Sequence, residues 1–152
     1  MGSHVPITQH LIVLFKKHLD QLKFELEQYS PESSLWLVPD GISNCAGNLA
    51  LHLVGNLNHF IGATLAHTGY KRQMDLEFSQ KNIPLAVIFA RIDDTKEMIA
   101  QSLTDLRQSD LEKEYRRNPM EEYMTTEYFL LHLLAHLSYH LGQINYHRRL
   151  IV

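Results

Sequence analysis

The chain has 152 residues, of which 45% are hydrophobic and 20% are charged, and its formal net charge is −3. This length and composition predict a single globular domain spanning residues 1–152. The charge argues against nucleic acid as a partner, because phosphate contacts require clustered Lys and Arg. No apolar run approaches the roughly 18 residues of a membrane span, and the lone cysteine, Cys45, excludes an internal disulfide framework. We therefore expect a cytoplasmic protein with no membrane contact.

Apolar residues recur at intervals of three and four in four long segments, which is the pattern of amphipathic helices. These segments are 8–29, 44–67, 84–108 and 126–147. The segments between them, 31–43, 71–82 and 109–125, are polar or rich in Pro, Ser and Gly and are predicted to be linkers. No segment alternates every second residue, so a sheet is not expected. The sequence predicts an all-α fold of four helices joined by linkers longer than the usual two to eight residues or so.

Residues with known preferences for helix ends mark two of the helix starts. Ser43 or Asn44 is predicted to be the N-cap of the second helix. Thr126, with Thr125 beside it, is predicted to cap the fourth helix.

The fourth helix carries a line of polar residues between two apolar flanks. At about 100° per residue, four polar side chains lie within about 40° of His136. They are His132, His140, Gln143 and His147. Leucines on one flank and tyrosines on the other argue that this line is not a solvated face. Histidines at positions i and i+4 lie one turn apart, so both rings can reach one metal ion.

The second helix repeats this arrangement with Asn48, His52, Asn56 and His59, again beside an apolar flank. Burying both apolar flanks brings the two polar lines together, so that one histidine and a His-x-x-x-His pair converge. Three imidazoles suit zinc, nickel, copper or iron(II) and leave at least one coordination position open. Spacing alone leaves a second interpretation, a hydrogen-bonded polar seam between helices.

Two stretches of the chain resemble a known family. Leu35–Gly62, LWLVPDGISNCAGNLALHLVGNLNHFIG, resembles the first signature of the DinB-like (YfiT/DinB) superfamily of metal-binding four-helix bundles. His132–Arg148, HLLAHLSYHLGQINYHR, resembles its second signature. The two motifs cover about a third of the chain. The resemblance implies a four-helix bundle in up-down-down-up order, with a long crossover between the second and third helices.

The resemblance also implies a ligand set. In that family, a histidine of the second helix and a His-x-x-x-His pair before Gly-Gln in the last helix bind a divalent metal, and these positions match His52, His136 and His140. The implied ion is zinc or nickel, with iron or manganese as alternatives. Neighbouring polar residues are then candidates for orienting an imidazole or a bound water by hydrogen bonding. They are Asn56, His59, His132 and Gln143.

Family members with known activity include metal-dependent thiol transferases and a thiol-dependent isomerase. The resemblance therefore implies that a metal ion activates a low-molecular-weight thiol for attack on a small electrophile. A metal-dependent hydrolase is an alternative, although neither ligand line holds an Asp or Glu as general base. Another is a non-catalytic metal-binding or dimerisation module, and a homodimer is expected. DNA repair, suggested by the family name, finds no support in the charge.

Overall fold

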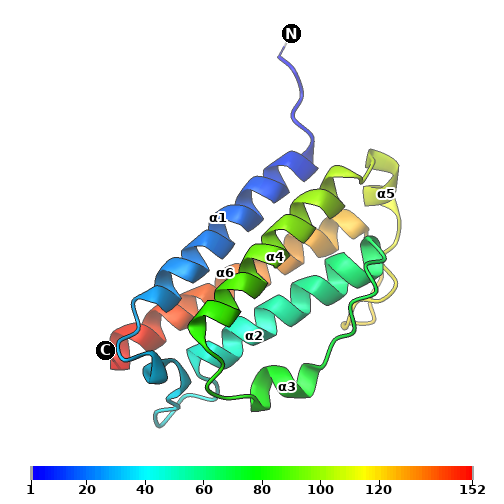
Figure 1. Cartoon of the computed structure of the whole chain (residues 1–152). Coiled ribbons are helices and arrows are strands. Elements are labelled where there is room, and N and C mark those ends of the chain that lie inside the picture. The colour runs from blue at the N-terminus through cyan, green and yellow to red at the C-terminus, as the bar shows by residue number, and fades with distance from the viewer. Residues whose placement is uncertain (1, 152) are drawn as a thin grey trace.

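The computed structural model describes residues 2–151, which form helices and connecting segments without a β-strand. The all-α prediction is therefore confirmed. Four helices are long (Figure 1). They are α1 (Ile7–Glu27), α2 (Ala46–Leu57, which continues as a π-helical turn, η2, over Asn58–Ala63), α4 (Leu85–Thr104) and α6 (Thr126–Ile151). Within the described residues, no helix is both long and apolar enough to cross a membrane.

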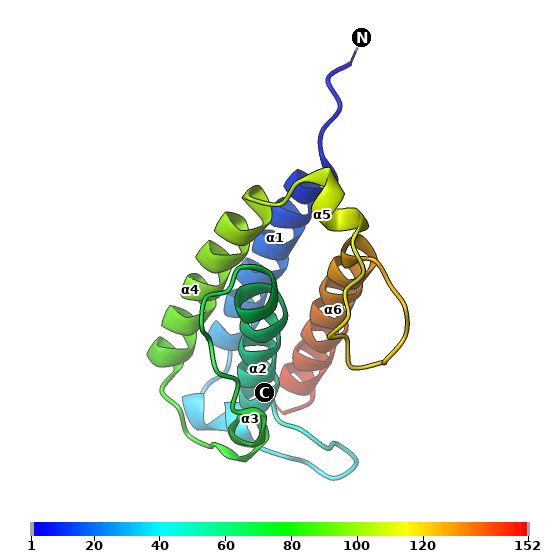
Figure 2. The same cartoon turned by 90° about the vertical axis from the view of Figure 1, so that its right-hand side faces the viewer.

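The long helices lie side by side around one core, as the two views in Figures 1 and 2 show. Both α1 and α2 pack against α4 and α6. In Figure 1, α2 and α4 run in the same direction, and α1 and α6 run in the opposite one. The chain from residue 64 to residue 84 therefore returns along the length of α2 before α4 begins. This returning segment lies against α2, and it supplies part of the site described below.

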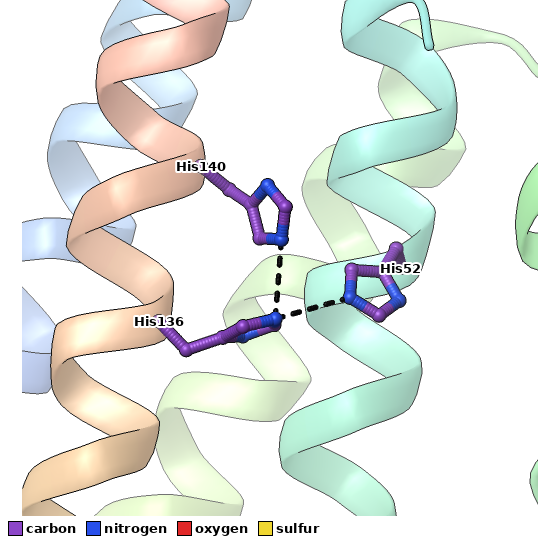
Figure 3. Close-up of side chains that lie close together, drawn as sticks. All are labelled: His52, His136 and His140. Atoms are coloured by element: carbon purple, nitrogen blue, oxygen red, sulfur yellow. Dashed lines mark hydrogen bonds between the residues drawn. The ribbon is translucent and has the colours of Figure 1, made fainter. Parts of the chain in front are cut away.

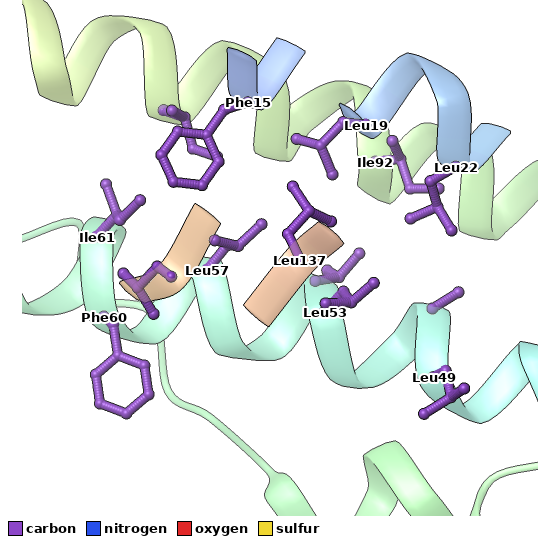
Figure 4. Packing of buried hydrophobic residues seen from close by; sticks show 14 of the residues in the cluster. Phe15, Leu19, Leu22, Leu49, Leu53, Leu57, Phe60, Ile61, Ile92 and Leu137 are labelled. Carbon is purple, nitrogen blue, oxygen red and sulfur yellow. The ribbon is translucent and has the colours of Figure 1, made fainter. Parts of the chain in front are cut away.

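Leucine, isoleucine and phenylalanine side chains from all four long helices fill the core (Figure 4). Phe15 of α1, Leu53 of α2, Ile92 of α4 and Leu137 of α6 each have a relative exposure of 0%. Full burial of such a side chain contributes about 1.5–3 kcal/mol. These apolar contacts hold α2 and α6 in register, and they do not depend on any polar group between the helices.

Two of the predicted linkers contain short helices, so residues 2–151 hold six α-helices rather than four. The additional helices are α3 (Met74–Ser79) and α5 (Gln108–Glu112), and a 3-10 turn, η1, spans Glu32–Trp36. Helices of five or six residues are too short for periodicity to reveal, and they are marginal without tertiary contacts. In this fold α3 packs on α2, and α5 packs on α6.

Both predicted N-caps differ by one or two residues from the observed ones, although α6 begins at Thr126 as predicted. The N-cap of α2 is Cys45, with no side-chain cap, rather than Ser43 or Asn44. At α6, the hydroxyl of Thr125 accepts a hydrogen bond from the backbone N–H of the third helical residue at 3.1 Å. Thr125 is therefore the capping side chain, and Thr126 instead donates its hydroxyl to a carbonyl of the preceding segment.

Candidate metal centre

Three imidazoles from two helices converge at the centre of the α2–α6 interface (Figure 3). The Nε2 atom of His136 lies 3.3 Å from Nε2 of His52 and 3.1 Å from Nε2 of His140. One ligand atom from each ring lies within 4.8 Å of the other two. Two imidazole nitrogens bound tetrahedrally to zinc at about 2.0–2.1 Å lie about 3.3 Å apart. The observed separations therefore fit a set of ligands around one ion.

Burial keeps the imidazoles of His136 and His140 in the neutral form that binds a metal. His52 is 8% exposed, and the other two rings are half-buried. Burial lowers the pKa of His136 to about 4, with further lowering from the neighbouring rings of His140 and His52. Burial likewise lowers the pKa of His140. His136 and His140 are therefore neutral at pH 7, each with a nitrogen lone pair available for coordination.

A carboxylate hydrogen-bonds to His52 at Nδ1, the ring nitrogen that does not face the other two imidazoles. The Nδ1–H of His52 donates to Oε1 of Glu77 at 3.1 Å. Arg72 donates from Nε to Oε2 and from a terminal nitrogen to Oε1, both at 2.9 Å. Burial opposes ionisation of Glu77, but the hydrogen bonds from His52 and Arg72 outweigh it and hold the pKa of this carboxyl below its usual value. An ionised Glu77 fixes the proton of His52 on Nδ1 and leaves the Nε2 lone pair facing the other two rings.

The other two ligand candidates differ in what surrounds them. Nδ1 of His140 donates to Oε1 of Gln143 at 2.7 Å, which likewise leaves Nε2 free of a proton. Nδ1 of His136 and Oδ1 of Asn56 are both buried and have no partner within residues 2–151. Unpaired buried polar atoms are rare in folded proteins. Both of these atoms lie on the helices that carry the three imidazoles, α2 and α6.

The remaining histidines of the two polar lines lie outside the cluster. His59 is half-buried on the π-helical turn, and His132 is exposed. The cluster of possible metal ligands contains neither of them. His147 is buried, with Nδ1 2.7 Å from the hydroxyl of Tyr29 and Nε2 2.8 Å from the carbonyl of Leu37. In the line of polar residues on α6, His147 at one end is hydrogen-bonded to neighbouring segments. His136 and His140, at the centre of the line, belong to the three-histidine cluster.

Sequence reasoning missed Glu77 and Arg72, because both belong to a segment that was predicted to be a linker. One signal did exist in α2. Gly55 lies in the interior of that helix, where glycine costs roughly 0.5–1 kcal/mol relative to alanine. A Cβ atom at this position would lie 1.9 Å from Oε2 of Glu77. The glycine therefore makes room for the carboxylate that reaches His52.

A comparison with curated proteins finds no match to this sequence. A comparison with family profiles does find one, and the matched region extends from α1 to α6 and contains all three clustered histidines. Because this match covers residues 14–144, the chain belongs to the DinB superfamily.

Proposed function

We propose that the chain binds one divalent metal ion through His52, His136 and His140 and activates a low-molecular-weight thiol for transfer to a small electrophile. The observation that carries this proposal is the convergence of three Nε2 atoms from α2 and α6. A bound ion supplies a positive charge that lowers the pKa of a thiol beside it. Zinc or nickel suits the three imidazoles, with iron or manganese as alternatives.

Residues around the cluster favour metal binding because they fix the tautomers of His52 and His140, so that each ring directs the lone pair of Nε2 toward the ion. Glu77, held by Arg72, keeps the proton of His52 on Nδ1, and Gln143 does the same for His140. The long helices supply a rigid frame, and we propose that they form a four-helix bundle of up-down-down-up order. The long segment between α2 and α4 carries Glu77, which contacts His52 at Nδ1.

Hydrolysis is supported less well than thiol transfer. A hydrolase needs a general base near the open coordination position. Glu77 contacts His52 at Nδ1, on the edge of the ring away from the cluster, and Arg72 occupies both of its oxygens. The group of possible metal ligands found within residues 2–151 contains no carboxylate. A thiol that ionises beside the metal does not require such a base.

A non-catalytic metal site would be favoured by a fourth protein ligand that closes the coordination sphere. The two remaining candidates, His59 and His132, lie outside the cluster. A coordination sphere with three protein ligands leaves a position at which a substrate can bind the ion, and this supports a catalytic role over a purely structural one. The homodimer stays a prediction.

Cobalt(II) in place of the native ion provides the test. Adding ethanethiol should produce an intense sulfur-to-metal charge-transfer band in the near ultraviolet. The His52→Ala variant should lose this response, and His132→Ala, as the control, should keep it. If millimolar thiols leave the cobalt spectrum unchanged, thiol transfer is excluded. If azide and cyanide also leave it unchanged, the coordination sphere is closed and the structural role replaces the catalytic one.

A further inference from the structure

A cavity of about 410 Å³ opens between α2, α4 and the segment that returns along α2 (Figure 1). Its size lies within the range of about 300–1,000 Å³ that is typical of small-molecule sites. Leu51 and Val54 of α2 and Thr95 of α4 supply the buried part of its wall. Glu77 also lines the cavity, and its carboxylate contacts His52 at Nδ1. The cavity is therefore separate from the converging Nε2 atoms of the metal centre.

Three charged side chains line this cavity without an ionic partner. Lys71 belongs to the returning segment, and Arg91 and Asp94 lie three residues apart on α4, hence on one face of that helix. All three are exposed. No ion pair within residues 2–151 includes any of them. By contrast, Asp93 and Lys96 of the same helix are both paired with residues of α1. The charges that line the cavity are thus free to bind a ligand.

The charges of the wall specify the charges of a matching ligand. Glu77 is the remaining charged residue of the lining, and two hydrogen bonds from Arg72 compensate its charge. Two cations and one anion, Lys71, Arg91 and Asp94, are left without compensation. A ligand that pairs with all three carries two negative groups and one positive group. The apolar part of the wall suits a short hydrocarbon chain between these groups.

We propose that this cavity is a binding site for a small acidic amino acid, a molecule with two carboxylates, one ammonium group and a short methylene chain. The two carboxylates pair with Lys71 and Arg91, and the ammonium group pairs with Asp94. The methylene groups pack against Leu51 and Val54. No metal ion takes part in this binding, so the inference goes beyond the proposed function and stands independently of it.

The test is an NMR titration of the purified, isotope-labelled chain with three ligands at matched ionic strength. L-Glutamate carries all three charged groups, glutarate lacks the ammonium group, and L-glutamine lacks the second carboxylate. Glutamate should bind about tenfold more tightly than either of the others, since each of them loses one charge-assisted hydrogen bond. The amide signals that shift should belong to residues 70–80 and 91–95, which contain most of the lining.

Two exposed substitutions should change the selectivity in different ways. Asp94→Asn should remove the preference for glutamate over glutarate and keep the preference over glutamine, because only the ammonium group loses its partner. Arg91→Gln should do the reverse, because one cation then remains for two carboxylates. The matched controls are Glu97→Gln and Lys16→Gln, which are exposed changes outside this cavity and should keep both preferences.

The outcomes are clear-cut, and none of them depends on metal content. Failure of glutamate to shift the signals of residues 70–80 and 91–95 at millimolar concentration would overturn the inference. Equal affinities for the three ligands would also overturn it, as would a selectivity that Asp94→Asn and Arg91→Gln leave unchanged. A preference for glutamate that each variant alters in the expected direction, and that both controls keep, supports the site.

Discussion

Nδ1 of His52 lies 3.1 Å from Oε1 of Glu77, a residue 25 positions further along the chain. Glu77 is buried and belongs to α3, which packs on α2. The returning segment therefore contributes to the site without supplying a metal ligand. A carboxylate on the far nitrogen of a ligating imidazole fixes its tautomer and raises its basicity. The following predictions test this relationship and the site around it.

Glu77→Gln should weaken metal binding about 10- to 100-fold, as expected when a hydrogen-bonding partner of a ligating histidine is lost. The amide keeps the size of the side chain but removes the charge that holds the His52 proton on Nδ1. Competition with a chromophoric chelator measures the affinity. Glu97→Gln, an exposed change on α4, is the control. Equal affinities for the Glu77→Gln variant and the unaltered protein would show that the carboxylate plays no part in metal binding.

Two glycine substitutions should have opposite effects on stability. Gly142→Ala should stabilise the protein by about 0.5–1 kcal/mol, since this exposed helical position has nothing within 4 Å of a new Cβ. Gly55→Ala should destabilise it, because the new methyl group would lie 1.9 Å from Oε2 of Glu77. Urea unfolding of the two variants measures both effects. Stabilisation of similar size at both positions would show that Glu77 does not occupy the space beside Gly55.

The metal-free protein should lose stability as the pH falls from about 6.5 toward 4. The pKa of His136 is lowered from its ordinary value of 6.5 to about 4, mainly by burial. In this interval the unfolded chain takes up a proton at His136 that the folded chain does not, so protonation favours unfolding. The half-exposed ring makes the effect modest. Urea midpoints of chelator-treated protein at several pH values measure it. His136→Gln should make the profile less steep, with the lowered pKa of His140 retaining part of the slope, and His10→Gln should not. A flat profile for the unaltered chain would contradict the prediction.

Removing the metal should lower the melting temperature and leave the helices intact. An ion that binds only the folded chain stabilises it by about 2.7 kcal/mol at a hundredfold excess over Kd. The core between α1, α2, α4 and α6 is made of apolar side chains that do not depend on the ion. Circular dichroism with and without a chelator measures both quantities. Loss of helical signal at room temperature after chelation would mean that the ion holds the fold together.

Helical periodicity predicted that His52, His136 and His140 converge, and the three side chains do lie together in the structure. His136 and His140 are one turn apart on α6, and the buried leucine flank beside them turns both rings toward His52, whereas the tyrosine flank is exposed. Periodicity did not show where the line of polar residues ends. His147 shares the angular position of the cluster, yet its contacts are to Tyr29 and Leu37, which come from other parts of the chain.

Glu77 could not be placed for a different physical reason. Its helix, α3, has six residues, too few for an apolar pattern, and its position is set by contacts with α2. Glu77 and His52 are 25 residues apart in the sequence, so patterns within one helix or turn cannot predict their contact. Gly55 was the one residue in the sequence that indicated a close approach to α2. A single glycine within a helix does not predict which side chain fills the space beside it.

The central claim is a metal site made of three histidines, and the metal content of the purified chain tests it most directly. The chain is prepared without an affinity metal, and elemental analysis measures bound zinc, nickel, iron and manganese per chain. We predict about one ion for the unaltered protein and none for the double variant His136→Ala, His140→Ala, since one imidazole cannot hold the ion. The matched double variant His59→Ala, His132→Ala removes two histidines outside the cluster and should keep the ion. Full metal content in the His136→Ala, His140→Ala protein would contradict the account.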